Sequence, residues 1–143
     1  MKIKLLIPVY NDWQSVIKLL KIINSEVSGL SHEFSAIVVN DASTESRPEI
    51  SLNLENLNSI QIINMKENQG HARCNATGLK HIFENQEFDY IIPMDGDGED
   101  RPKWIVEWHS RDKFPESIWL CGEKKGLSCL YLNDYKLIEK ILK

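Results

Sequence analysis

Residues 3–12 read IKLLIPVYND, and this stretch decides the fold. Residues 3–9 form a nearly continuous apolar run, which is typical of a strand that is buried on both faces of a sheet. A polar turn follows, and it leads into residues 13–23, where apolar side chains recur at helical spacing. Asn11 or Asp12 can cap the start of that helix. The stretch therefore predicts a strand, a short turn and a helix in direct succession.

The same pattern recurs along the chain. Further strands are predicted over residues 34–39, 59–65, 89–94 and 117–121. Further helices are predicted over residues 48–57, 70–85, 102–109 and 127–143. Apolar strands that alternate with helices indicate an α/β fold, with a mainly parallel, Rossmann-like sheet covered by helices on both faces. A length of 143 residues fits one compact domain.

Composition excludes several classes of function. A formal net charge of −4 gives no support to binding along a nucleic-acid backbone, so no nucleic-acid partner is expected. The three cysteines form no CxxC pair, which argues against a zinc knuckle or a disulfide framework. The apolar run of residues 3–9 is too short for a signal peptide or a membrane span. A cytoplasmic location is the expectation, with the inner face of the membrane as a further option.

An acidic turn, DGDGED at residues 95–100, follows the strand predicted over residues 89–94. Ligands of parallel sheets bind beyond the carboxyl ends of the strands. If the strand continues through the turn, Asp95 and Asp97 point the same way, because strand side chains alternate. Two such carboxylates suit Mg²⁺ or Mn²⁺, and Glu99 would be a third or water-mediated ligand. Taken alone, however, the run is better explained as a solvated acidic turn.

Four segments at predicted strand ends carry a family resemblance. They are IPVYND at residues 7–12, VVNDAS at 38–43, NQGHAR at 68–73 and MDGDGEDRP at 94–102. In this order and spacing the sequence resembles the family 2 glycosyltransferases, which have the GT-A fold. The resemblance covers residues 1–125, which are expected to form the nucleotide-sugar-binding domain. It looks closest to the branch that contains the polyprenyl-phosphate sugar synthases.

The resemblance implies a role for each matching residue. The nucleotide pocket would be lined by Pro8, Tyr10 and Asp12, and the other substrate-binding residues would be Asp41, Ser43, Gly70 and Asp95. Asp41 would accept hydrogen bonds from the base, whereas Gly70 and Arg73 would lie near the diphosphate. The metal ligands would be Asp95, Asp97 and Glu99, with Asp97 and Arg73 as the catalytic residues. The implied reaction is metal-dependent sugar transfer from a UDP- or GDP-sugar to a polyprenyl phosphate or a saccharide.

The segment after the acidic turn is short for this family. Only residues 101–143 follow it, which is less than an acceptor subdomain normally needs. The chain is therefore expected to be truncated, with residues 126–143 as an amphipathic helix left from the acceptor region. Lysines opposite its apolar stripe allow peripheral membrane contact as an alternative to packing on the sheet. A non-catalytic remnant that binds nucleotide sugar is the alternative function.

Two further hypotheses, a metal site on a helix and a nucleotidyltransferase function, receive less support from the sequence. His71 and Cys74 lie three residues apart on a predicted helix, but without a second pair they are expected to have ordinary packing and surface roles. A nucleotidyltransferase would usually carry a glycine-rich phosphate loop after its first strand. Residues 8–12 contain no glycine, which argues against that class.

Overall fold

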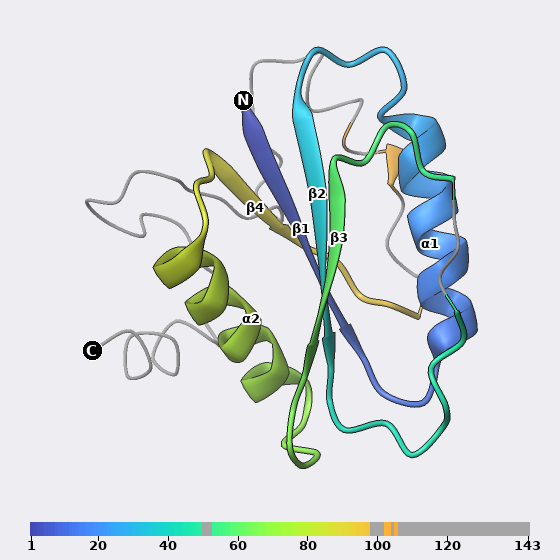
Figure 1. Ribbon diagram of the computed structural model, residues 1–143, viewed down its shortest axis with the longest axis vertical. Helices are drawn as coiled ribbons and strands as arrows, with labels where there is room; N and C mark the ends of the chain where they lie inside the picture. The colour runs from blue at the N-terminus through green and yellow to red at the C-terminus, as the bar shows by residue number, and fades with distance from the viewer. Residues whose placement is uncertain (50–52, 98–101, 104, 106–143) are drawn as a thin grey trace.

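The computed structural model describes residues 1–49, 53–97, 102, 103 and 105 (Figure 1). In chain order its elements are β1 (Lys2–Val9), α1 (Trp13–Glu26), β2 (Glu33–Asn40), β3 (Ser59–Asn64), α2 (His71–Asn85) and β4 (Tyr90–Pro93). These elements confirm the first four predicted strands and the helices predicted over residues 13–23 and 70–85. The strand predicted over 117–121, the helix predicted over 127–143 and most of the helix predicted over 102–109 lie outside the described residues.

The four strands form one parallel sheet in the order β3-β2-β1-β4. β1 pairs with β2 along its whole length, from Lys2 opposite Glu33 to Val9 opposite Asn40. The chain builds outward from β1 to β2 and β3, and it then returns to place β4 on the other side of β1. Such a reversal opens a crevice beyond the carboxyl ends of the two strands that flank it, here β1 and β4.

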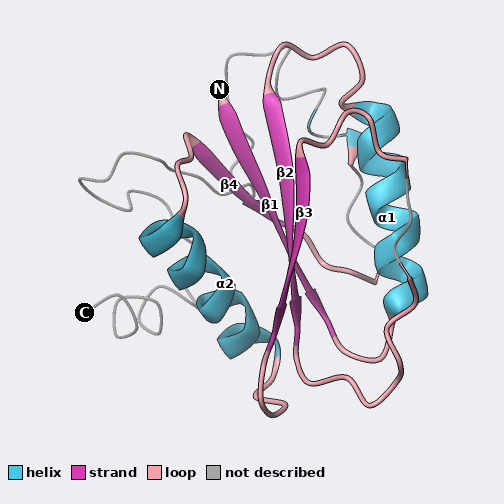
Figure 2. Cartoon of the chain, in the orientation of Figure 1, coloured by secondary structure: helices cyan, strands magenta, loops and turns pink. Residues whose placement is uncertain are grey.

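The helices lie on opposite faces of the sheet, with α1 on one side and α2 on the other (Figures 1 and 2). Successive side chains of β1 point to opposite faces of the sheet and contribute to both cores. Leu5 and Ile7 pack in the core under α1, and Leu6 packs in the core under α2. The buried face of α1 is formed by Trp13, Val16, Leu19, Leu20 and Ile23. Within the described residues, no helix is long and apolar enough to cross a bilayer.

Gly78 lets α2 lie close to the sheet. A Cβ atom at this position would lie 2.3 Å from Leu6 Cδ1 and 2.8 Å from Val39 Cγ2. Glycine therefore removes a clash that any other residue would create with β1 and β2. The close packing fixes α2 against the sheet and sets where its first residue, His71, projects at the carboxyl edge.

The helix predicted over residues 48–57 is wrong for the part of that segment that the structure describes. Glu55 and Asn56 form a turn there, and residues 50–52 lie outside the description. The Asn56 backbone N–H donates to Asn24 Oδ1, and Asn56 Nδ2 donates to the Asn24 carbonyl, both at 2.9 Å. These bonds to the end of α1 take the place of helical ones, because asparagine side chains compete well for backbone groups.

β4 is shorter than predicted, and this removes one argument about the acidic turn. The strand ends at Pro93, and the Met94 N–H makes one more bond to the Leu6 carbonyl at 2.9 Å. Gly96 and Asp97 then form a turn. The strand therefore does not run through Asp95 and Asp97, and the condition under which strand alternation would align them is not met. The turn and its packing determine where these carboxylates lie.

Candidate functional site

An open pocket of about 370 Å³ lies at the carboxyl edge of the sheet. Its lining residues are Pro8, Val9, Tyr10, Asp12, Val16, Asp41, His71, Cys74, Asp95, Gly96 and Asp97. They come from the ends of β1 and β2, the first turns of α1 and α2, and the turn after β4. The pocket thus occupies the crevice that the reversal of strand order creates.

The acidic turn is pressed against the end of β1. A Cβ atom on Gly96 would lie 2.8 Å from the Pro8 carbonyl oxygen and 3.1 Å from Val16 Cγ2. Only glycine fits here without displacing backbone, so the turn reaches the pocket wall because it lacks a side chain at its centre. Asp95 and Asp97 on either side of Gly96 are exposed and line the same pocket.

Asp41 holds the start of α2. Its side chain is buried, with 4% exposure, and its two oxygens accept from the Gln69 and Gly70 backbone N–H groups at 2.9 Å each. A carboxylate at this place also counters the partial positive charge of the helix N-terminus. The start of α2, near which the resemblance places the diphosphate, therefore already has a carboxylate partner in Asp41.

Asn11 joins the turn after β1 to the loop after β2. Its backbone has a φ of 50°, which asparagine tolerates better than most residues. Its Oδ1 accepts from the Thr44 and Glu45 N–H groups at 2.8 and 3.1 Å, and its own N–H donates to Ser43 Oγ at 2.9 Å. Ser43 thus bonds to Asn11 and is not among the residues that line the pocket. Sequence reasoning gave Asn11 no such role.

Two other predicted site residues, Gly70 and Arg73, are not among the described residues that line the pocket. Gly70 precedes α2 with a φ of 85° and is not among the lining residues. The exposed Arg73 side chain points its Nη1 at Gln69 Oε1, 3.5 Å away, and it does not line the pocket. Glu99 lies outside the described residues.

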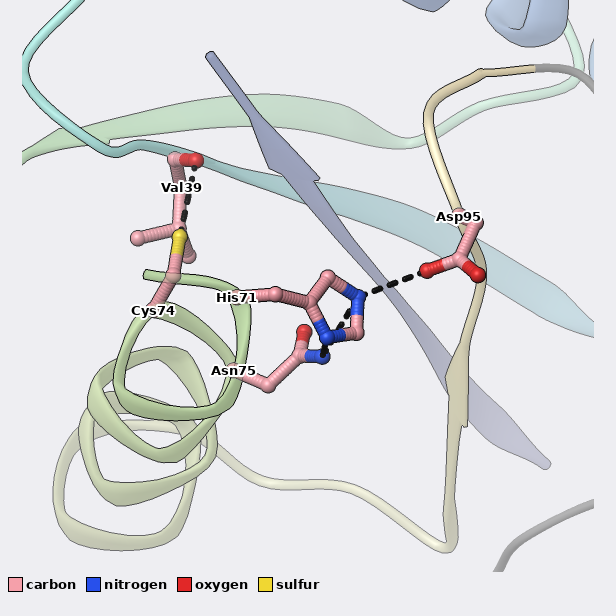
Figure 3. A network of polar contacts seen from close by, with 5 residues as sticks. All are labelled: Val39, His71, Cys74, Asn75 and Asp95. Carbon is pink, nitrogen blue, oxygen red and sulfur yellow. Dashed lines mark hydrogen bonds and ion pairs between the residues drawn. The ribbon is translucent and has the colours of Figure 1, made fainter. Parts of the chain in front are cut away.

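His71 meets the acidic turn across the pocket. Its Nε2 lies 2.7 Å from Asp95 Oδ1, and the ring projects from α2 toward the turn (Figure 3). Asn75, one helical turn further on, places its Nδ2 3.2 Å from His71 Nε2. The expectation of an ordinary surface role for His71 missed this contact. The signal that could have found it was its position directly after Gly70, inside one of the four strand-end segments.

Cys74 is a buried residue of the pocket lining. Its Sγ lies 3.3 Å from the Val39 carbonyl oxygen, to which the thiol donates (Figure 3). Burial, together with the negative charge of Asp41, raises the pKa of the Cys74 thiol to about 12. The group is therefore a neutral thiol near pH 7, which suits a packing role because metal ligation and nucleophilic attack need the thiolate.

The acidic turn has the donor chemistry of a hard-cation site. Within the described residues no three His, Cys, Asp or Glu side chains gather closely enough to form a metal cage. Mg²⁺ is usually bound through one or two carboxylates together with substrate phosphates, so a complete protein cage is not required. Asp95 and Asp97 beside an open pocket fit that kind of site.

A family model described as Glycosyl transferase family 2 matches residues 5–108, which is more than half of the chain. The chain belongs to glycosyl transferase family 2. Every residue that lines the pocket falls inside the matched range. The family 2 assignment therefore confirms the predicted resemblance at the level of the family.

Solved structures agree with the family 2 assignment in fold. The crystal structure of S. aureus TarS in complex with UDP-GlcNAc has a TM-score of 0.57 and 20% identity, over 77% of this chain and 30% of that one. The crystal structure of TarS in complex with UDP has a TM-score of 0.56 and 19% identity, over 77% of this chain and 31% of that one. The chain thus spans less than a third of the length of these structures. The likeness confirms the predicted α/β, GT-A-like sheet.

Proposed function

We propose that this family 2 domain binds a nucleoside diphosphate sugar in the pocket beyond β1 and β4, and that it serves metal-dependent transfer of the sugar. One observation carries the proposal: Asp95 and Asp97 line the same pocket, at the point of the sheet where α/β folds bind their ligands. The acceptor is proposed to be a lipid phosphate, as in the polyprenyl-phosphate branch, or a saccharide.

The nucleotide proposed first is a uridine diphosphate. TarS, which shares the fold, was solved with UDP and with UDP-GlcNAc. In this chain Tyr10 is 49% exposed and lines the pocket, so it offers an aromatic side chain on which a base can stack. Asp12 lies beside it and accepts from the Ser15 N–H at 3.3 Å, which keeps its carboxylate at the first turn of α1. A GDP-sugar is the second nucleotide to test.

The acidic turn would hold the cation. Asp95 and Asp97 are the proposed ligands of a Mg²⁺ or Mn²⁺ ion, with Glu99 as a further ligand, and such an ion when bound stabilises a departing diphosphate as a Lewis acid. Arg73 is the proposed cationic side chain for the diphosphate. Its contact to Gln69 is long, at 3.5 Å, so little is lost if the guanidinium turns toward the ligand.

Isothermal titration calorimetry tests the donor half of the proposal. UDP and GDP are titrated into the chain with Mn²⁺, with Mg²⁺ and with a chelator. Binding of UDP that requires the metal is expected, and a folded chain that binds neither nucleotide would contradict the proposal.

Asp97→Asn tests the metal ligand by removing its charge and keeping its shape. We expect metal-dependent UDP affinity to fall at least about 100-fold. Removing a group that only orients a metal ligand already lowers metal affinity about 10–100-fold, and Asp97→Asn removes a proposed direct ligand. The matched control is Glu84→Gln, which removes a carboxylate charge from the exposed end of α2. Unaltered UDP affinity in Asp97→Asn would show that the metal assignment is wrong.

Sugar transfer is tested separately from donor binding. Radiolabelled UDP-sugars are incubated with the chain, the metal and either a polyprenyl phosphate or a panel of saccharides. Labelled product supports the complete reaction. Metal-dependent UDP binding without transfer to any acceptor would favour a non-catalytic nucleotide-sugar-binding role for this chain.

A further inference from the structure

The contact between His71 and Asp95 joins the first residue of α2 to the acidic turn. We propose that His71 is a positioning residue, which holds the Asp95 carboxylate in the orientation that binds the metal of a nucleotide complex. This role rests on the proposed function of the pocket. It concerns the side chain that aims a metal ligand, and His71 itself is not proposed as a ligand.

Stability does not explain the contact. The side chains of His71 and Asp95 are 58% and 52% exposed, and exposed pairs of this kind contribute little to the free energy of unfolding. α2 is already fixed by Asp41 at its start and by the close packing of Gly78. The contact therefore adds little to the attachment of the helix, and its main effect is local, on the direction of the Asp95 side chain.

Asp95 lies beyond the end of β4, where the position of its side chain is set by contacts with other elements. Met94 bonds to the Leu6 carbonyl, and Gly96 and Asp97 then form a turn. A side chain on a turn is held less firmly than one on a helix or strand, and sites are more exact when rigid elements support them. His71 supplies that support from α2. Because an ionised carboxylate only accepts hydrogen bonds, Nε2 is the donor, and the carboxylate has about four acceptor positions in all.

Asn75 lies against the imidazole ring from the next turn of the helix (Figure 3). With Nε2 donating to Asp95, Nδ1 of a neutral ring is the acceptor, and Asn75 Nδ2 lies 3.5 Å from it. Between the two residues, the buried Cys74 anchors this turn to Val39. Groups that orient metal ligands in this way typically change metal affinity about 10–100-fold when they are removed.

The test compares His71→Ala and His71→Gln with the unchanged chain. Glutamine keeps an N–H donor at a similar reach, and His81→Ala is the matched control, because it removes a histidine from the same helix but away from the pocket. The Mn²⁺ dissociation constant is measured by electron paramagnetic resonance at saturating UDP. The UDP dissociation constant is measured by calorimetry at rising Mn²⁺, and circular dichroism checks the fold.

We expect His71→Ala to weaken Mn²⁺ binding about 10–100-fold. Raising Mn²⁺ should then restore UDP affinity to that of the unchanged chain, because the nucleotide contacts are intact. His71→Gln should retain most of the Mn²⁺ affinity, and His81→Ala should retain all of it. If His71→Ala fails to fold, the positioning role is tested with His71→Gln alone. A folded His71→Gln variant that loses Mn²⁺ affinity in full overturns the role of the N–H donor.

Two other results would overturn the positioning role. Unchanged Mn²⁺ affinity in His71→Ala contradicts it and leaves the proposed function standing. UDP affinity that stays low at saturating Mn²⁺ would show that His71 acts on the nucleotide instead. If the unchanged chain binds no Mn²⁺ with UDP, the proposed function fails, and the positioning role fails with it.

Discussion

The turns after β2 and β4 present aspartates at the same edge of the sheet and use them differently. Asp41, after β2, is 4% exposed and accepts two backbone N–H groups from the start of α2. Asp95 and Asp97, after β4, are exposed beside the pocket. The difference shows that an aspartate at a strand end is buried in the service of the fold when backbone donors lie within its reach. Asp95 and Asp97 are the aspartates proposed to serve a ligand.

The turn after β2 also supports the turn after β4, through α2. Asp41 fixes the start of α2, and α2 carries His71, which contacts Asp95. A buried carboxylate that satisfies backbone donors thus places the group that touches the exposed carboxylate. The comparison predicts that changes at Asp41 act mainly on stability, whereas changes in the acidic turn act mainly on metal-dependent binding.

Asp41→Ala should have the largest effect on stability. It removes a charged acceptor from two N–H groups, so the free energy of unfolding should fall by about 1–3 kcal/mol. Urea denaturation followed by circular dichroism measures the change. Asp89→Ala is the control, because the exposed Asp89 accepts from the Lys2 N–H at the other end of the sheet and should matter less. A stable Asp41→Ala variant that loses UDP binding would instead favour the base-binding role implied by the family resemblance.

Gly96→Ala should have a smaller effect on stability and a clear one on binding. The new Cβ atom would lie 2.8 Å from the Pro8 carbonyl, so the acidic turn has to shift. We expect a loss of about 1–2 kcal/mol in unfolding free energy, as for overpacking. Metal-dependent UDP affinity, measured by calorimetry, should fall about tenfold, as for a misaligned ligand.

Gly29→Ala is the control for Gly96→Ala. Gly29 has a φ of 81°, and nothing lies within 4 Å of a Cβ atom built on it. Alanine there should lower stability through backbone strain and leave UDP binding unchanged. Equal losses of UDP affinity in the two variants would mean that binding follows stability and not the shape of the acidic turn.

Ser43→Ala should have the smallest effect. The Asn11 N–H loses its acceptor at the junction of two loops, so we expect a loss of about 1 kcal/mol or less. UDP affinity should stay unchanged, because Ser43 does not line the pocket. Ser43→Thr, which keeps a hydroxyl, is the matched variant. A drop in UDP affinity for alanine alone, at unchanged stability, would support the substrate-binding role implied by the resemblance.

Local patterns were sufficient for most of the fold. The apolar run in residues 3–9 and the helical spacing after it predicted β1 and α1, and Asp12 caps α1 as one of the two expected residues. The same approach failed over residues 48–57, where bonds between Asn56 and Asn24 replace a helix. That partner lies on α1, 32 residues away, so no local pattern could reveal it.

The sequence by itself determined how strands and helices follow one another along most of the chain, and where the acidic turn lies. Apolar periodicity and glycine positions act over a few neighbouring residues, so they can be recognised without the tertiary structure. The tertiary structure decided which polar groups satisfy one another. Asp41 meets residues 28 and 29 positions away, and His71 meets Asp95 across 24. Hydrogen bonds depend on distance and direction in space. Only the packed sheet and helices could therefore separate the buried aspartate that accepts backbone N–H groups from the two exposed ones at the same pocket.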